Sequence, residues 1–199
     1  MYRYTPTKRY NKTLDFVQQH LKESTVILDL GVENPLAQKI KALGHEVYNT
    51  HGEDLDTNFS IVYDSKYEVV TAFEILEHLV SPYPLLKAIK AKKLIASIPL
   101  KLWFAAAYRS KSDLRDRHYH EFESWQFDWL LEKAGWRIVA RNKSTNPGPF
   151  KLGIRPILRW FTPRYYIADL ERIARKSYEN CHCDSYPQRS RFYSTNIGF

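Results

Sequence analysis

Alternating apolar and polar residues divide the first fifty positions into short predicted elements. Apolar side chains recur every three or four residues over 13–22, which predicts a helix. The run 25–31 is apolar and β-branched before a closing Asp-Leu-Gly, which predicts a buried strand leading into a turn. A second helix is predicted over 34–43, opened by an Asn-Pro pair, and a second strand over 45–49. This strand–helix–strand unit implies a parallel pair with a right-handed crossover.

The alternation of strands and helices continues along the rest of the chain. Further strands are predicted over 67–72, 93–98, 136–140 and 191–197, and further helices over 81–89, 124–134 and 167–174. Such alternation predicts an α/β protein with a doubly wound, mostly parallel sheet and helices on both faces.

Length and composition indicate a single globular domain over 1–199. The proline-rich segment 142–180 is expected to form a cap or a long connection within it. No apolar run is long enough to span a membrane and the start has no apolar signal region, so the expected location is the cytoplasm. Cys181 and Cys183 flank His182 without a second cysteine pair, so no zinc site is expected.

The predicted chemistry lies where the strands end, because ligands of open α/β sheets bind beyond the carboxyl ends of the strands. Four strand ends carry polar or small residues: Asp29-Leu-Gly31, Asn49-Thr50, Phe73-Glu74 and Ser97-Ile98-Pro99. The first of them leads into the predicted helix start at Asn34-Pro35, where backbone N–H groups can receive a carboxylate or phosphate.

The order of these segments resembles the class I S-adenosylmethionine-dependent methyltransferases, especially the small-molecule branch that includes ubiquinone-pathway O-methyltransferases. The similarity covers about residues 24 to 140. It rests on the segments 26–31, 53–55, 67–79, 93–99, 120–122 and 130–136, and Phe73-Glu-Ile-Leu-Glu-His-Leu79 is its most specific part. The resemblance implies a Rossmann-like, seven-stranded sheet with one antiparallel strand near its edge, and S-adenosylmethionine as methyl donor.

The resemblance also assigns roles to residues that match the family's cofactor motifs. It implies that Asp29 and Gly31 border the methionine end of the cofactor and that Asn49 faces the ribose. It further implies that Asp54 and Leu55 flank the adenine.

By the same match, Phe73 and Glu74 lie along the cofactor. The first loop departs from the family pattern, in which Asp-x-Gly continues with two more glycines. Here only Gly31 remains, and Glu33 adds a negative charge. A non-catalytic scaffold that has lost the cofactor is therefore one alternative, and it predicts that Glu33 or Pro35 fills the pocket.

Histidines are the candidate bases for methyl transfer to an oxygen or nitrogen of a small-molecule acceptor, because histidine titrates near neutral pH. His78 and His120 are the predicted catalytic residues, with His118 as a further candidate. Trp103-Phe104 and Tyr108 either line an acceptor pocket or pack internally. The net charge of +8 favours an anionic acceptor or another anionic partner.

A second alternative is a metal-assisted RNA 2′-O-methyltransferase. In the resemblance to the small-RNA 2′-O-methyltransferases, Glu74, Glu77, His78 and a later histidine, His118 or His120, hold Mg²⁺. The metal would lower the pKa of an acceptor hydroxyl. The aromatic and basic stretch 155–166 either binds nucleic acid, lies on a membrane or packs as a cap; nucleic acid is the less favoured partner because basic residues are spread along the chain.

Overall fold

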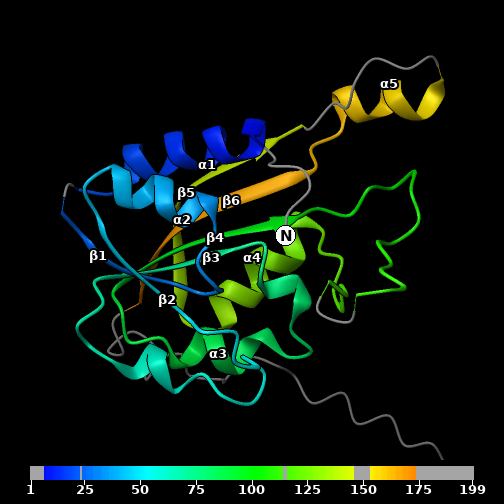
Figure 1. Ribbon diagram of the computed structural model, residues 1–199. Helices are drawn as coiled ribbons and strands as arrows, with labels where there is room; N and C mark the ends of the chain where they lie inside the picture. Colours follow the sequence, from blue (N-terminus) through cyan, green and yellow to red (C-terminus); the bar gives the residue numbers. More distant parts are fainter. Residues whose placement is uncertain (1–6, 23, 114–115, 146–152, 174–199) are drawn as a thin grey trace, which may run out of the picture.

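A computed structural model describes residues 7–22, 24–113, 116–145 and 153–173 (Figure 1). In chain order, its elements are α1 (Thr7–His20), β1 (Val26–Asp29), α2 (Pro35–Ala42), β2 (Glu46–Asn49), η1 (Ser60–Tyr63), β3 (Val69–Phe73), η2 (Leu76–His78), α3 (Pro82–Ala88), β4 (Lys93–Pro99), α4 (Ser124–Lys133), β5 (Trp136–Ser144), α5 (Ile154–Phe161) and β6 (Tyr165–Arg172).

The strands form one mixed sheet in the order β2-β1-β3-β4-β6-β5. Strands β2, β1, β3 and β4 run parallel to one another, and β6 is antiparallel to both β4 and β5. The predicted mostly parallel sheet and its one antiparallel strand are therefore present. The described residues form six strands rather than the seven that the resemblance implies. The strand predicted over 191–197 lies outside the described residues.

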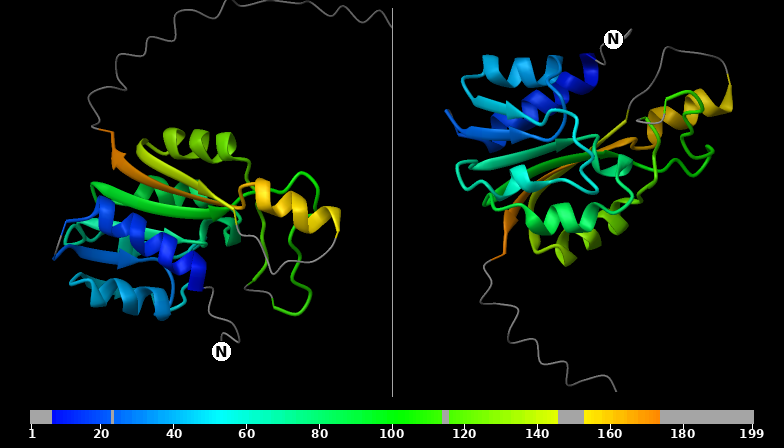
Figure 2. Two further views of the ribbon diagram at one scale, coloured as in Figure 1. Left: turned by 90° about the horizontal axis from the view of Figure 1, so that it is seen from above. Right: turned by 60° about the horizontal axis from the view of Figure 1, so that its bottom comes forward.

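Helices cover both faces of the sheet, with α1 and α2 on one face and α3 and α4 on the other (Figures 1 and 2). Neighbouring strand residues face opposite sides: Ile27 packs with the core under α1 and α2, whereas Leu28 packs with the core over α3 and α4. Val69 and Val70 divide in the same way. Because both faces are buried, these strands need continuous apolar runs rather than alternation.

Capping explains why α2 begins where the sequence predicts. The side-chain oxygen of Asn34 accepts hydrogen bonds from the backbone N–H groups of Leu36 (2.9 Å) and Ala37 (3.1 Å). Pro35 occupies the first helical position, where its missing N–H costs nothing. This cap also means that the N–H groups expected to receive a ligand's carboxylate are already bonded within the protein.

The helix predicted over 167–174 is wrong, because residues 167–172 belong to β6; residue 174 lies outside the described residues. Tyr166, Ala168 and Leu170 alternate along the strand and are fully buried in the core over α3 and α4. Between them, Asp169 faces the other side and pairs with Lys93 at 3.1 Å. The apolar spacing that suggested a helical face thus comes from a strand that is largely buried on both faces.

The segment 142–180, predicted as a cap or connection, contributes to the sheet as well. Its first residues complete β5 and its later described residues form β6. Among the described residues of this segment, α5 stands off one end of the sheet, above the loop that follows β4 (Figure 1). None of the described helices has the length and apolar character needed to cross a lipid bilayer.

Candidate functional site

A cavity of about 330 Å³ opens at the carboxyl ends of β1, β3 and β4. Its walls come from α1, the turn after β1, the η2 segment and the chain between β4 and α4, together with the start of β6. The residues that carry its chemistry are Arg9, Asp29, Gly31, Phe73, Glu74, Glu77, His78, Tyr108, Asp116, His118, Arg164 and Tyr165. This is the edge of the sheet where the sequence predicts a ligand.

Asp29 is a buried carboxyl held by two neighbours at the end of β1. It accepts hydrogen bonds from the Thr71 hydroxyl at 2.6 Å and from the Asn49 side-chain amide at 3.0 Å. Burial raises the pKa of Asp29 to about 6, against the opposing effect of these two hydrogen bonds. A carboxyl that titrates near neutral pH in a cavity is a frequent property of functional sites.

Gly31 makes the tight turn that follows β1. Its φ is +130°, and a side-chain carbon added there would approach Ile75 Cδ1 to 3.3 Å. Its N–H donates to the Thr50 hydroxyl at 2.7 Å, while its carbonyl accepts from the Asn49 amide at 3.1 Å. Asn49 therefore braces this turn from behind and does not line the cavity, in contrast to the predicted ribose contact.

The loop that follows β1 leaves the cavity open. Glu33 turns away from it and pairs with Lys41 at 2.8 Å, with its side chain 50% exposed. Neither Glu33 nor Pro35 lines the cavity, although Gly31 and Asn34 do. The blocked pocket that the scaffold alternative predicts is therefore not observed.

Asp54 and Leu55, predicted beside the adenine, do not line the cavity. Asp54 organises a local turn, in which its carboxylate accepts from the N–H of Asp56 at 3.0 Å. The Leu55 side chain is buried in the core over α3 and α4. The acidic and polar run that follows β2 is thus used for turn formation and core packing.

Glu74 stands at the end of β3 with a φ of +55°, an uncommon conformation for a residue other than glycine. It forms an ion pair with Arg9 at 3.0 Å and accepts from the Ser97 hydroxyl at 3.3 Å. Burial raises the pKa of Glu74, and the positive charge of Arg9 opposes this rise. The sequence alone does not indicate Arg9, because no local motif links α1 to a strand end 65 residues later.

Glu77, His78 and His118 form a compact cluster in which one ligand atom from each lies within 4.8 Å of the others. The Glu77 side chain is 1% exposed, and its Oε2 has no hydrogen-bond partner within the described part of the chain. Burial and the nearby Glu74 raise the pKa of Glu77 well above its ordinary value. Glu74, the fourth predicted ligand, is not part of this group.

The hydrogen bonding of His78 fixes its tautomer. Nδ1 lies 2.9 Å from the carbonyl oxygen of Arg117. Because a carbonyl only accepts, Nδ1 carries the proton, and in the neutral ring Nε2 keeps its lone pair. The rings of His78 and His118 meet edge to face at 4.8 Å. Burial lowers the pKa of His118, and His78 lowers it further, which favours a neutral imidazole.

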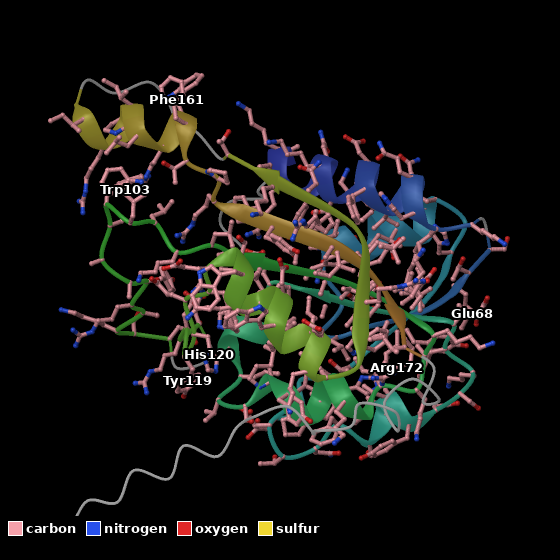
Figure 3. The ribbon with its side chains drawn as sticks, turned by 180° about the vertical axis from the view of Figure 1, so that it is seen from behind. Glu68, Trp103, Tyr119, His120, Phe161 and Arg172 are labelled. Atoms are coloured by element: carbon pink, nitrogen blue, oxygen red, sulfur yellow. The ribbon has the colours of Figure 1, made fainter. Side chains whose placement is uncertain are left out.

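His120 lies outside the cavity, although the sequence predicts it as a catalytic residue. Its Nε2 is 3.1 Å from the Val80 carbonyl, and its ring stacks on Phe122 at 5.3 Å. Figure 3 shows it beside Tyr119. The backbone N–H groups of Tyr119 and His120 donate to the Glu77 carbonyl, so this segment positions the η2 turn from outside.

No family model matches the chain, and no curated protein matches it by sequence. Solved structures do match. A Listeria monocytogenes protein provisionally described as an S-adenosylmethionine-dependent methyltransferase is 13% identical, with a TM-score of 0.59 over 83% of this chain and 99% of that one. A SAM-dependent methyltransferase from Archaeoglobus fulgidus is 15% identical, with a TM-score of 0.58 over 86% and 96%.

A third match is phosphoethanolamine N-methyltransferase 2 from Haemonchus contortus in complex with S-adenosylmethionine. It is 12% identical, with a TM-score of 0.55 over 82% of this chain and 53% of that one. Identities this low establish the fold alone. The chain therefore has the Rossmann-like fold of S-adenosylmethionine-dependent methyltransferases, with a cavity at the carboxyl ends of its strands.

Proposed function

We propose that this protein is an S-adenosylmethionine-dependent methyltransferase acting on an oxygen or nitrogen of a small-molecule acceptor. The observation that carries the proposal is the convergence of Asp29, Gly31, Phe73 and Glu74 on one open cavity in a methyltransferase fold. These four are the part of the predicted cofactor set that reaches the cavity, and they come from two strand ends.

The charged side chains that line the cavity match the charged groups of this cofactor. S-adenosylmethionine carries an ammonium, a carboxylate and a sulfonium, and when bound it supplies the methyl group. Asp29 and Glu74 offer carboxylates to the cationic groups, and Arg9 offers a guanidinium to the carboxylate. The turn at Gly31 allows a ligand close to the backbone because no side chain projects from it.

His78 is the proposed base. Its Nδ1–H is held by the Arg117 carbonyl, so the ring is fixed in the tautomer that leaves Nε2 able to take a proton. An acceptor hydroxyl or amine next to Nε2 would lose its proton there as its oxygen or nitrogen attacks the methyl carbon. Positioning of the acceptor by the cavity walls would supply much of the remaining rate.

Cofactor binding is tested by calorimetric titration with S-adenosylhomocysteine. We expect Gly31→Val to weaken binding by about tenfold or more, because the added side chain strains the turn and enters the ligand's space. Gly44→Val is the matched control. Gly44 also has a positive φ, +95°, but it lies in the turn between α2 and β2 and does not line the cavity.

Both valine variants should lose stability through backbone strain, so the comparison isolates the effect on the ligand. Gly44→Val should bind S-adenosylhomocysteine with nearly unchanged affinity. If the folded wild-type protein does not bind the ligand at millimolar concentration, the proposed function is wrong. If both variants weaken S-adenosylhomocysteine binding equally, the ligand does not bind next to the turn at Gly31.

The second candidate is metal-assisted methyl transfer to a hydroxyl, for which a 2′-hydroxyl of RNA is the predicted acceptor. The observation that favours it is the Glu77, His78 and His118 cluster with its unpartnered buried carboxylate oxygen. A divalent cation would neutralise that oxygen, and its chemistry when bound would be to lower the pKa of the acceptor hydroxyl. Glu77 and His118 would hold it together with Nε2 of His78.

For this candidate we expect Mn²⁺ to bind and His118→Ala to weaken its affinity by about tenfold or more, because one of three protein ligands is lost. His120→Ala is the control and should change the affinity by less than about twofold, since His120 does not belong to the cluster. Isothermal calorimetry or Mn²⁺ paramagnetic resonance measures both. Absence of Mn²⁺ binding, or equal losses in both variants, would leave the metal-free reaction as the working mechanism.

A further inference from the structure

A second cavity of about 300 Å³ lies between α5 and the loop that follows β4. The loop contributes Leu102, Ala105 and Tyr108, which give it an apolar and aromatic wall. The opposite wall carries two guanidinium groups, those of Arg159 on α5 and Arg164 just before β6. Figure 3 shows the two sides of this gap, with Trp103 on the loop and Phe161 on α5.

The second cavity adjoins the proposed cofactor cavity. Tyr108, Arg164 and Tyr165 line both cavities and therefore form their common boundary. A ligand in the second cavity would reach this boundary from the side opposite Asp29 and Gly31, which line the first cavity alone. This is the relation that an acceptor must have to a methyl donor, since the two have to meet at one point.

The positive charge of this cavity is only partly offset by the protein, because Arg164 also acts electrostatically on Glu74 and Glu77 of the first cavity. Within the described ranges, neither Arg159 nor Arg164 forms an ion pair with a carboxylate. Arg164 donates one N–H to the Leu100 carbonyl at 3.2 Å, which fixes its side chain and leaves other donors available. The carboxylates of Asp116 and Glu121 accept hydrogen bonds from the hydroxyl and the backbone N–H of Tyr108, which hold them beside Tyr108 without removing their charge.

We propose that this cavity binds the methyl acceptor and that the acceptor is an anion with an apolar body. Arg159 and Arg164 hold its phosphate or carboxylate, because a guanidinium fork matches the oxygens of either group. Leu102 and Tyr108 contact the apolar part. The role as acceptor site rests on the proposed methyltransferase function, whereas anion binding by the two arginines does not.

Such an anion has two sources, a free metabolite or a lipid headgroup. A lipid headgroup is compatible with the exposed apolar side chains of α5. At least half of each of these side chains is exposed: Ile154, Ile157, Trp160 and Phe161. Trp103 on the facing loop is 71% exposed as well. Both sources share the chemistry of a phosphate or carboxylate on an apolar group, and the experiment separates them.

The probe is phenyl phosphate, titrated by calorimetry into the full-length protein with and without saturating S-adenosylhomocysteine. Arg159→Gln should weaken binding by about tenfold, the effect of losing a charge-assisted pair of hydrogen bonds. Arg155→Gln is the matched control, because Arg155 lies on the same exposed helix but does not line the cavity. It should change the affinity by less than about twofold.

Sedimentation with vesicles separates the two sources. Binding to phosphatidylserine vesicles but not to phosphatidylcholine vesicles, weakened by Arg159→Gln more than by Arg155→Gln, assigns the anion to a lipid headgroup. Phenyl phosphate binding without vesicle binding assigns it to a free metabolite. Both results support the proposed site.

The proposal is overturned if neither probe binds, or if Arg155→Gln weakens binding as much as Arg159→Gln. Its failure is distinguishable from failure of the proposed function. Binding of S-adenosylhomocysteine without binding of either probe refutes the proposed acceptor site and leaves the proposed methyltransferase function standing. Binding of phenyl phosphate at Arg159 without binding of S-adenosylhomocysteine removes the methyltransferase function and with it the role as acceptor site.

Discussion

Replacing His78 by asparagine is expected to slow methyl transfer by about a hundredfold or more, the usual contribution of a positioned general base. Asparagine can place its side-chain N–H where His78 Nδ1 now meets the Arg117 carbonyl, at 2.9 Å. The variant thus keeps the local hydrogen bond and loses the Nε2 lone pair. S-adenosylhomocysteine affinity should change by less than about threefold, because the base acts on the acceptor rather than on the cofactor.

Transfer of radiolabelled methyl from S-adenosylmethionine to a small-molecule fraction of a cell extract measures this effect. His120→Asn is the control: the ring of His120 is turned toward the Val80 carbonyl and lies outside the cavity. It should retain at least about half of the wild-type rate. If His120→Asn abolishes methyl transfer while His78→Asn slows it little, the base is His120 rather than His78.

The predicted site residues that line the cavity lie within short segments whose ends are fixed by a strand. Asp29 and Gly31 close β1, and Phe73 and Glu74 close β3, so each follows directly from where an apolar run stops. In a parallel sheet these ends meet at one edge whatever the loops do. Prediction of this edge therefore required the strands alone.

Several predicted site residues on loops do not line the cavity, because the direction of a loop side chain depends on contacts far away in sequence. Asp54 and Leu55 follow β2 in a run of turn-forming residues, and the turn they adopt carries them away from the cavity. His118 and His120 are two positions apart and would share one face of a regular strand. The chain bends at Tyr119 between them, and only His118 lines the cavity. Only the folded loop decides that His118 is the one facing His78.

Long-range pairing accounts for the residues that sequence reasoning missed. Arg9 on α1 reaches Glu74, and Arg164 and Tyr165 enter the cavity from the start of β6. The Arg9 ion pair also draws Glu74 away from the group formed by Glu77, His78 and His118. The spacing of Glu74 and Glu77 alone suggested two carboxylates on one metal, and the tertiary partner of Glu74 changes that reading.

The second large effect is expected from Asp29, whose replacement by asparagine should flatten the pH dependence of stability. Its folded pKa is raised from 3.8 to about 6 by burial, so the folded protein binds this proton more tightly than the unfolded chain does. The stabilisation is complete below about pH 4 and is lost as the pH rises through 6. A difference of about two pH units corresponds to about 3 kcal/mol of unfolding free energy.

Urea unfolding followed by tryptophan fluorescence at several pH values between 4 and 8 measures this loss. The wild-type protein should lose about 2 kcal/mol more than Asp29→Asn between pH 4 and pH 8, because part of the total difference already falls below pH 4. Asp15→Asn, on the exposed face of α1, should follow the wild type. Identical pH profiles for the wild type and Asp29→Asn would show that folding does not raise the pKa of the Asp29 carboxyl. Repeating the series with S-adenosylhomocysteine connects this result to function, because a cationic group bound beside Asp29 would lower its folded pKa and reduce the loss.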